Sequence, residues 1–241
     1  MPIEIWEAPQ IAVAPAQADW QRLAALIDHT LFKPESTNTE VLQLCREAAG
    51  YGFHCVMLNP TYVSLAVSLL EGTSVKVGCL IGFPFGANTT TVKRYEALDA
   101  IRLGARELDM VMNVGALKSG DRDRVQADMR GLVEVAHDNG ALLKITIETV
   151  LLSLEEKILA CQLAVAAGAD FVKSSTGFSH AGAVPADISL MRGVVGEKLG
   201  VKASGGIRTF EDAQTMIEAG ATRIGTSCGV GIVESARAKS V

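Results

Sequence analysis

Short apolar runs alternate with helical patterns along almost the whole chain. The first run covers residues 27–32, and residues 40–49 then show apolar positions with the period of a helix. Helical stretches repeatedly end at Gly-Ala, as at Gly104, Gly168 and Gly220. Eight alternations of this one unit predict a single closed (β/α)8 TIM barrel rather than an open sheet.

The individual elements follow from the same pattern. A helical stretch at 19–26 precedes the first strand, so we expect an extra N-terminal helix before the barrel. The expected strands are 27–32, 53–58, 75–81, a run around Asp109, runs around Lys144, Lys173 and Lys202, and 223–226. The other expected helices are 40–49, a stretch from Pro60 to 70, 90–103, 122–138, a stretch opening at Ser153, 187–199 and 209–219.

The start of the chain differs from the rest in composition. Residues 1–16 hold three of the seven prolines and no basic residue, which is not the composition of a signal peptide. We therefore expect residues 1–16 to be a loose extension and 17–241 to be one barrel domain. The length of 241 residues suits a single α/β barrel.

One apolar strand contains a lysine. Phe171 and Val172 begin the strand, Lys173 continues it, and Ser-Ser-Thr-Gly then breaks it into a loop of small residues. A charge inside a strand is costly unless it has a partner or a task. A lysine at the carboxyl end of a strand suits amine chemistry on a carbonyl substrate, whereas a lone lysine is more often a rim residue or a salt-bridge partner.

The neighbouring strand–helix units favour a catalytic role for Lys173 over a structural one. Lys144, Lys173 and Lys202 follow one another at intervals of 29 residues, about the length of one strand–helix unit. In a closed parallel barrel these lysines lie at one level of adjacent strands, and Asp109 lies one unit earlier. A nearby ammonium and burial both lower the pKa of an amine, which makes it a nucleophile. We expect Lys173 to be the nucleophile and Lys202 or Lys144 to be its cationic neighbour, while Asp109 either moves protons or only holds a lysine.

Glycine-rich loops follow the last strands. Ser204-Gly205-Gly206-Ile207-Arg208 comes after the seventh strand, and Gly225-Thr226-Ser227 belongs to the eighth strand and its loop. Backbone N–H groups of such loops bind anions, and these two loops are the usual phosphate site of a TIM barrel. The expected phosphate-binding residues are Gly177, Gly205, Gly206, Arg208, Gly225 and Ser227.

Composition then removes several classes of function. The net charge of −5 offers no basic surface for nucleic acid or membrane. The four histidines form no metal-ligand motif, so we expect neither a metal nor another cofactor. The five scattered cysteines indicate reduced thiols and a cytoplasmic protein, and no apolar run approaches about 18 residues.

Five motifs are specific when taken together: Asp28–Leu31, Leu108–Asn113, Lys144–Thr149, Phe171–Phe178 and Val201–Arg208. With these motifs the chain resembles the deoxyribose-phosphate aldolase family over residues 20–235. This resemblance implies a class I lyase that reversibly cleaves 2-deoxy-D-ribose 5-phosphate into acetaldehyde and D-glyceraldehyde 3-phosphate. It implies that Lys173 forms the Schiff base, that Lys202 perturbs this amine and joins Asp109 in proton transfer, and that Lys144 and Asp28 contact the substrate.

Three positions depart from the common family pattern. Met57 stands where many members have a cysteine, Phe178 where some members have a phosphate-binding lysine, and Cys228 where a second serine is common. Phosphate binding should therefore depend on loop amides and Arg208.

Two other functions remain open at this point. One is another phosphate-binding barrel enzyme, either a different Schiff-base aldolase or an isomerase, which would leave the three interior lysines unexplained. The other is a non-catalytic homologue, against which the intact Asp109, Lys173 and Lys202 argue. The missing histidine cluster disfavours a metal-dependent aldolase. A homo-oligomer, either a dimer or a tetramer, is also left open.

Overall fold

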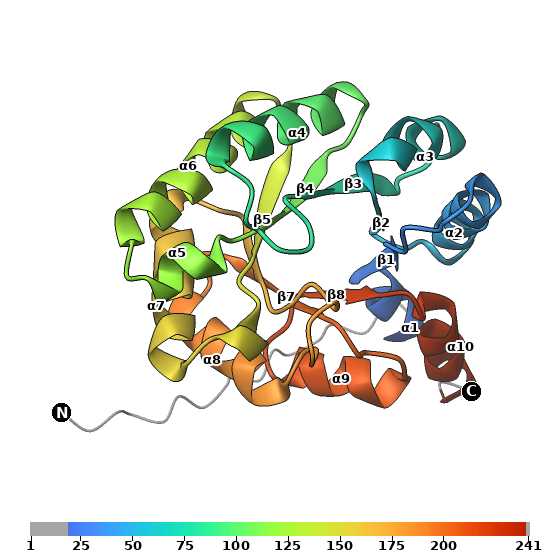
Figure 1. Ribbon diagram of the computed structural model, residues 1–241. Coiled ribbons are helices and arrows are strands. Elements are labelled where there is room, and N and C mark those ends of the chain that lie inside the picture. Colours follow the sequence, from blue (N-terminus) through green and yellow to red (C-terminus); the bar gives the residue numbers. More distant parts are fainter. Residues whose placement is uncertain (1–18, 240–241) are drawn as a thin grey trace.

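The computed structural model describes residues 19–239 and has a closed barrel of eight parallel strands at its centre (Figure 1). Each strand pairs with the next one along the chain, and the first strand pairs with the eighth. The prediction of a TIM barrel is therefore confirmed. The strands are β1 (Ile27–Leu31), β2 (Cys55–Leu58), β3 (Lys76–Ile81), β4 (Glu107–Val111), β5 (Leu142–Thr146), β6 (Phe171–Lys173), β7 (Gly200–Ser204) and β8 (Arg223–Thr226).

Helices form a ring outside the strands (Figure 1). The extra N-terminal helix, α1, packs against α10, whereas the predicted extension 1–16 lies outside the described residues. The helices are α1 (Asp19–Ala24), α2 (Asn38–Tyr51), α3 (Val63–Leu69), α4 (Thr90–Arg102), α5 (Val114–Lys118), α6 (Arg122–Asp138), α7 (Leu154–Ala167), α8 (Pro185–Val195), α9 (Phe210–Glu218) and α10 (Gly229–Lys239), with short 3-10 turns at Pro60–Tyr62 and Thr149–Leu151.

Several boundaries differ from the predicted ones. β2 begins at Cys55 instead of residue 53, and α8 covers Pro185–Val195 instead of 187–199. Proline is favoured in the first turn of a helix, which explains the earlier start of α8. Helices α5 and α10 were not expected, because α5 is only five residues long and α10 follows a glycine-rich loop.

Local sequence signals explain where the major helices begin and end. Thr37, Ser153 and Thr209 each cap a helix through a reciprocal capping box with an acid three residues later. Gly52 and Gly168 end α2 and α7 in the left-handed conformation, which glycine adopts without strain. These caps fix the ends of the helices and so bring the chain back to the barrel at regular intervals.

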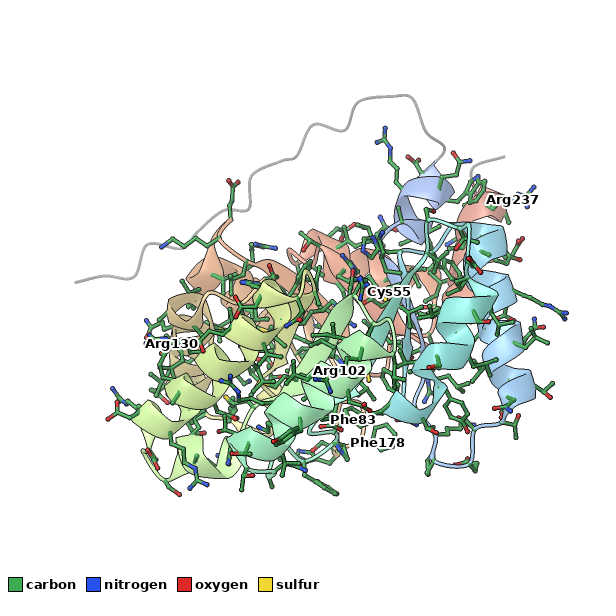
Figure 2. All side chains as sticks on the ribbon, turned by 90° about the horizontal axis from the view of Figure 1, so that it is seen from above. Cys55, Phe83, Arg102, Arg130, Phe178 and Arg237 are labelled. Atoms are coloured by element: carbon green, nitrogen blue, oxygen red, sulfur yellow. The ribbon has the colours of Figure 1, made fainter. Side chains whose placement is uncertain are left out.

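The apolar core lies mainly between the strands and the helices, while charged side chains occupy the barrel interior. Figure 2 shows Cys55 toward the end of the barrel where α1 lies, and Phe83 and Phe178 together at the opposite end, beyond the carboxyl ends of the strands. No helix within residues 19–239 has both the length and the apolar character needed to cross a membrane.

Candidate active site

Asp109 is the centre of a buried group of three lysines. Its Oδ1 accepts a hydrogen bond from Lys144 Nζ at 3.0 Å. Its Oδ2 accepts from Lys173 Nζ at 2.9 Å and from Lys202 Nζ at 2.8 Å. All four side chains are completely buried. The strand register causes this meeting, because Asp109 pairs with Lys144 and Lys173 pairs with Lys202 on adjacent strands.

A second set of charges lies deeper in the barrel. Asp28 is 2.5 Å from Lys202 Nζ, and Glu107 is 2.5 Å from Lys144 Nζ. Arg223 joins these two acids, since its guanidinium lies 2.8 Å from Asp28 and 3.0 Å from Glu107. The structure therefore places the predicted residues Lys144 and Asp28 in the same cluster as Asp109.

Glu107 and Arg223 were missed by the sequence analysis. Glu107 lies two residues before Asp109, and Arg223 lies two residues before Gly225. Alternate residues of a strand face the same side, so this spacing was the available signal. Arg223 also lies over the ring of Phe171, 5.0 Å from its centroid. Together these residues fill the barrel interior below the lysines.

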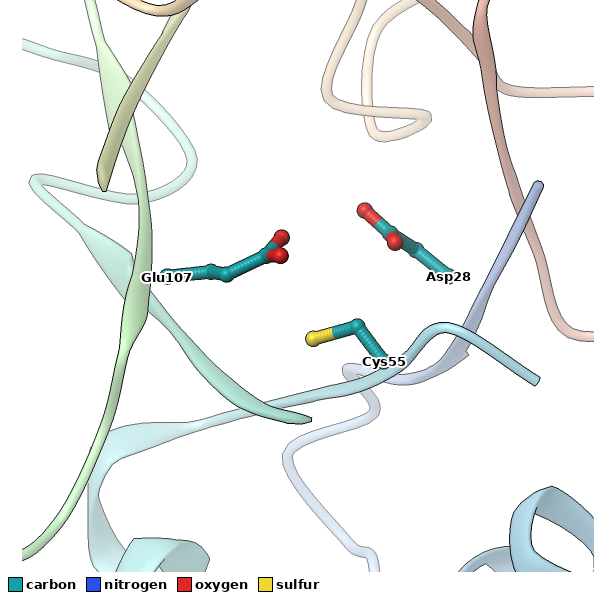
Figure 3. Close-up of side chains that lie close together, drawn as sticks. All are labelled: Asp28, Cys55 and Glu107. Carbon is teal, nitrogen blue, oxygen red and sulfur yellow. The ribbon is translucent and has the colours of Figure 1, made fainter. Parts of the chain in front are cut away.

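Asp28, Cys55 and Glu107 bring three possible metal-ligand atoms close together. Their donor atoms lie within 4.8 Å of one another, and Figure 3 shows both carboxyl groups pointing into the barrel with the thiol beside them. However, Lys202, Lys144 and Arg223 already pair with the two carboxylates. Burial raises the pKa of the Cys55 thiol well above its usual range, so the thiolate that a metal requires is disfavoured. The two carboxylates therefore fit an ion-pair network better than a metal site.

Burial and charge distinguish the lysines from one another. Burial lowers the pKa of Lys173 to about 8; Asp109 acts in the opposite direction, and Lys202 and Lys144 lower it further. Burial also lowers the pKa of Lys144, but Asp109, Glu107 and Asp28 outweigh burial and hold that pKa well above its usual range. Of these two amines, Lys173 is the one that loses its proton near neutral pH.

Asp109 stays ionised in this environment. Burial raises the pKa of its carboxyl, yet Lys144, Lys173 and Lys202 outweigh burial and hold the pKa well below its usual range. A carboxylate with three ammonium neighbours can accept and return a proton without leaving the site. Its position suits both alternatives that the sequence left open, namely proton transfer and positioning of a lysine.

A cavity of about 250 Å³ opens above the cluster, at the carboxyl ends of β6, β7 and β8. All six predicted phosphate-binding residues line it, together with Lys33, which the sequence analysis missed. Gly205 and Gly206 both have positive φ angles, so their backbone needs glycine here. The predicted phosphate-binding residues are Gly177, Gly205, Gly206, Arg208, Gly225 and Ser227.

Gly225 also makes room for a lysine arm. A Cβ atom at this position would lie 2.9 Å from Lys202 Cε and 2.7 Å from Ser204 Oγ. Gly225 therefore contributes to the cluster as well as to the cavity.

An aromatic row forms another wall of the site. Lys173 Nζ lies 5.6 Å from the centre of the Phe32 ring, Phe32 contacts Phe83, and Phe83 contacts Phe178 edge-on. Phe178 lines the cavity with the glycine-rich loops but carries no charge. Met57 lies in a buried apolar cluster with Cys55 and Leu80, against which Phe32 and Phe83 pack. Cys228 is not among the residues that line the cavity.

Comparison with known proteins agrees with this geometry. The model of the DeoC/LacD family of aldolases matches residues 22–235. The chain belongs to this family. The matched range includes both the buried lysines and the glycine-rich loops. Because this is a family of aldolases, the match gives no support to the isomerase alternative.

Several aldolase relatives are similar over nearly their whole length. A deoxyribose-phosphate aldolase of Geobacillus sp. is 56% identical over 218 residues, covering 90% of this chain and 97% of the relative. One from Clostridium perfringens is 55% identical, covering 90% and 96%. The solved structure of the Aeropyrum pernix deoxyribose phosphate aldolase, described as tetrameric, superposes with a TM-score of 0.86 at 37% identity, covering 92% of this chain and 94% of that one.

Proposed function

We propose that this aldolase reversibly cleaves 2-deoxy-D-ribose 5-phosphate into acetaldehyde and D-glyceraldehyde 3-phosphate through a Schiff base on Lys173. The observation that carries this proposal is the completely buried Lys173 amine, with a pKa of about 8, beneath a glycine-lined cavity. The relatives named deoxyribose-phosphate aldolase, which match 90% of the chain, support the same substrate.

The reaction begins with capture of the open-chain aldehyde. The neutral amine of Lys173 attacks C1, and loss of water gives a protonated Schiff base. A base removes the proton of the C3 hydroxyl, the C2–C3 bond breaks, and its electron pair moves toward the iminium nitrogen. Glyceraldehyde 3-phosphate leaves and an enamine stays on Lys173. Protonation of C2 and hydrolysis of the resulting imine release acetaldehyde and restore the amine.

Asp109 and Lys202 are the proposed proton carriers. Asp109 Oδ2 lies within 3 Å of both Lys173 Nζ and Lys202 Nζ, so a proton can pass among these groups with little movement. Lys144 and Asp28 hold Asp109 and Lys202 in place through ion pairs and present polar groups near the substrate. The phosphate group would bind to the amides of Gly177, Gly205 and Gly206, with Arg208 at the rim.

The proposal also includes the oligomeric state of the protein and its location in the cell. A homo-oligomer, either a dimer or a tetramer, is proposed on the strength of the Aeropyrum pernix relative, which is described as tetrameric. A cytoplasmic location stays a prediction that rests on the scattered cysteines.

Borohydride trapping tests the Schiff base. Incubation with acetaldehyde and borohydride should add two carbons irreversibly to Lys173, and peptide mass spectrometry identifies the modified residue.

Turnover of deoxyribose 5-phosphate should be unchanged by EDTA, because lysines already pair with the buried carboxylates. Loss of turnover in EDTA with recovery on adding zinc would contradict a Schiff-base mechanism.

The glycine-lined cavity predicts a strong preference for the phosphorylated sugar. We expect kcat/KM to be at least about 100-fold higher for deoxyribose 5-phosphate than for deoxyribose, because several charge-assisted hydrogen bonds to the phosphate are absent in the second substrate. Steady-state kinetics on both sugars measure this ratio, and inorganic phosphate should inhibit competitively. Equal efficiencies would contradict the assignment of the cavity.

A further inference from the structure

Glu148 lies just beyond β5 and has a backbone conformation that is rare for its residue type. Its φ angle is +57°, and it is the only non-glycine residue among 19–239 with a positive φ. The side chain is nearly completely buried. A buried acid in the left-handed region persists only where its surroundings enforce it, and such positions gather at functional sites. The catalytic steps proposed above make no use of this carboxylate.

The carboxylate contacts the loop after Lys173. Glu148 Oε2 accepts hydrogen bonds from Thr176 Oγ1 at 2.5 Å and from the backbone N–H of Thr176 at 3.1 Å. Thr176 Oγ1 in turn accepts from the backbone N–H of Phe178 at 3.1 Å. One carboxylate oxygen therefore fixes the segment 176–178, all three residues of which line the phosphate cavity.

The backbone on both sides of Glu148 is already tied to the same strand and loop. The N–H of Ile147 donates to the carbonyl of Lys173 at 3.0 Å, and the N–H of Thr149 donates to the carbonyl of Ser174 at 2.9 Å. These two bonds hold residues 147–149 beside β6, and the left-handed φ of Glu148 lies between them. The other carboxylate oxygen, Oε1, is buried without a hydrogen-bond donor among residues 19–239. A buried carboxylate oxygen without a donor from the protein costs free energy of folding.

We propose that Glu148 is a positioning residue for phosphate recognition: its carboxylate clamps Thr176–Phe178 and so sets the shape of the phosphate cavity. This inference rests on the function proposed above and adds a determinant of its substrate preference. The clamp holds the loop that follows Lys173. It does not involve the ion pair between the Lys173 amine and Asp109. Loss of the clamp should therefore weaken phosphate binding more than imine formation.

Glu148→Gly tests the carboxylate separately from the backbone, because glycine adopts a positive φ without strain. We expect kcat/KM for deoxyribose 5-phosphate to fall about tenfold, mainly through KM, because two hydrogen bonds to a charged acceptor are lost. The efficiency with deoxyribose and the rate of acetaldehyde trapping should stay within about twofold of the wild type. Glu148→Gln should recover much of the loss, because its amide oxygen can accept the same two hydrogen bonds.

Glu71→Gln is the matched control, since Glu71 is exposed beyond the end of α3. A wild-type substrate preference in Glu148→Gly would overturn the inference and leave the φ angle as a purely local feature. A parallel loss with both sugars that glutamine does not recover would also overturn it. Titration with inorganic phosphate gives an independent measurement: Glu148→Gly should bind it about tenfold more weakly than the wild type. That result stands even if deoxyribose 5-phosphate proves not to be the substrate.

Discussion

We expect Lys173→Arg to abolish turnover and borohydride trapping, with a loss of at least roughly 10³-fold in kcat. Arginine keeps a positive charge near Asp109 but does not lose its proton in proteins, so no free amine is available to attack the aldehyde. The measurements are steady-state turnover of deoxyribose 5-phosphate and the mass of peptides after trapping with acetaldehyde. Thermal unfolding should stay close to that of the wild type if the guanidinium retains the contact with Asp109.

The exposed Lys76, at the start of β3, provides a control for the same substitution. Lys76→Arg should leave both turnover and trapping unchanged. If Lys173→Arg still trapped acetaldehyde and the label were found on Lys144, the nucleophile would have been assigned to the wrong strand.

We expect Lys202→Leu to lower the rate at neutral pH and to move the pH dependence toward alkaline values. In the wild type, the free amine of Lys173 increases as pH rises through its pKa of about 8, so kcat/KM should increase up to that pH and then level off. Lys202 is one of the groups that lower this pKa. Without Lys202, Asp109 Oδ2 keeps only its hydrogen bond from Lys173 and stabilises the protonated amine more strongly. The pKa of Lys173 therefore rises. A rise of one unit reduces the free amine at neutral pH about tenfold.

The full pH profile separates this electrostatic effect from lost proton transfer. A pKa effect weakens at high pH, so the gap between Lys202→Leu and the wild type should narrow there, whereas a missing proton carrier lowers the rate at every pH. Trapping should still label Lys173, but more slowly at pH 7. A profile that coincides in shape with the wild type would show that Lys202 does not control the amine, and Lys76→Leu serves as the exposed control.

The barrel and much of the site could be predicted because their signals repeat. The interval of 29 residues placed Lys144, Lys173 and Lys202 at neighbouring positions, and the register confirms that adjacency for Lys173 and Lys202. The glycine-rich loops were predicted to lie together because the strands of a TIM barrel all point the same way. These inferences needed only the order of elements and their spacing.

Other features depend on pairing between distant residues. Arg223 contacts Glu107 across 116 positions of sequence, and nothing near either residue indicates the other. The left-handed φ of Glu148 was equally hidden, because glutamate is not a residue that favours it. Lys93 of α4 is a further example: it is completely buried, donates to the carbonyl of Val111 at the end of β4 at 2.9 Å, and pairs with Asp128 of α6 at 2.6 Å. Such positions are decided by tertiary packing after the elements have formed.

The composition of the buried cluster has a consequence for the direction of the chemistry. Three carboxylates, on Asp28, Glu107 and Asp109, are paired with four cationic groups. When the nucleophilic amine is neutral, the formal charges of these groups cancel, and either protonation of this amine or formation of the iminium leaves one positive charge in excess. The enamine is neutral, so carbon–carbon bond cleavage returns the cluster to balanced charge once the proton of the C3 hydroxyl has also left the cluster. The cationic groups are Lys144, Lys173, Lys202 and Arg223.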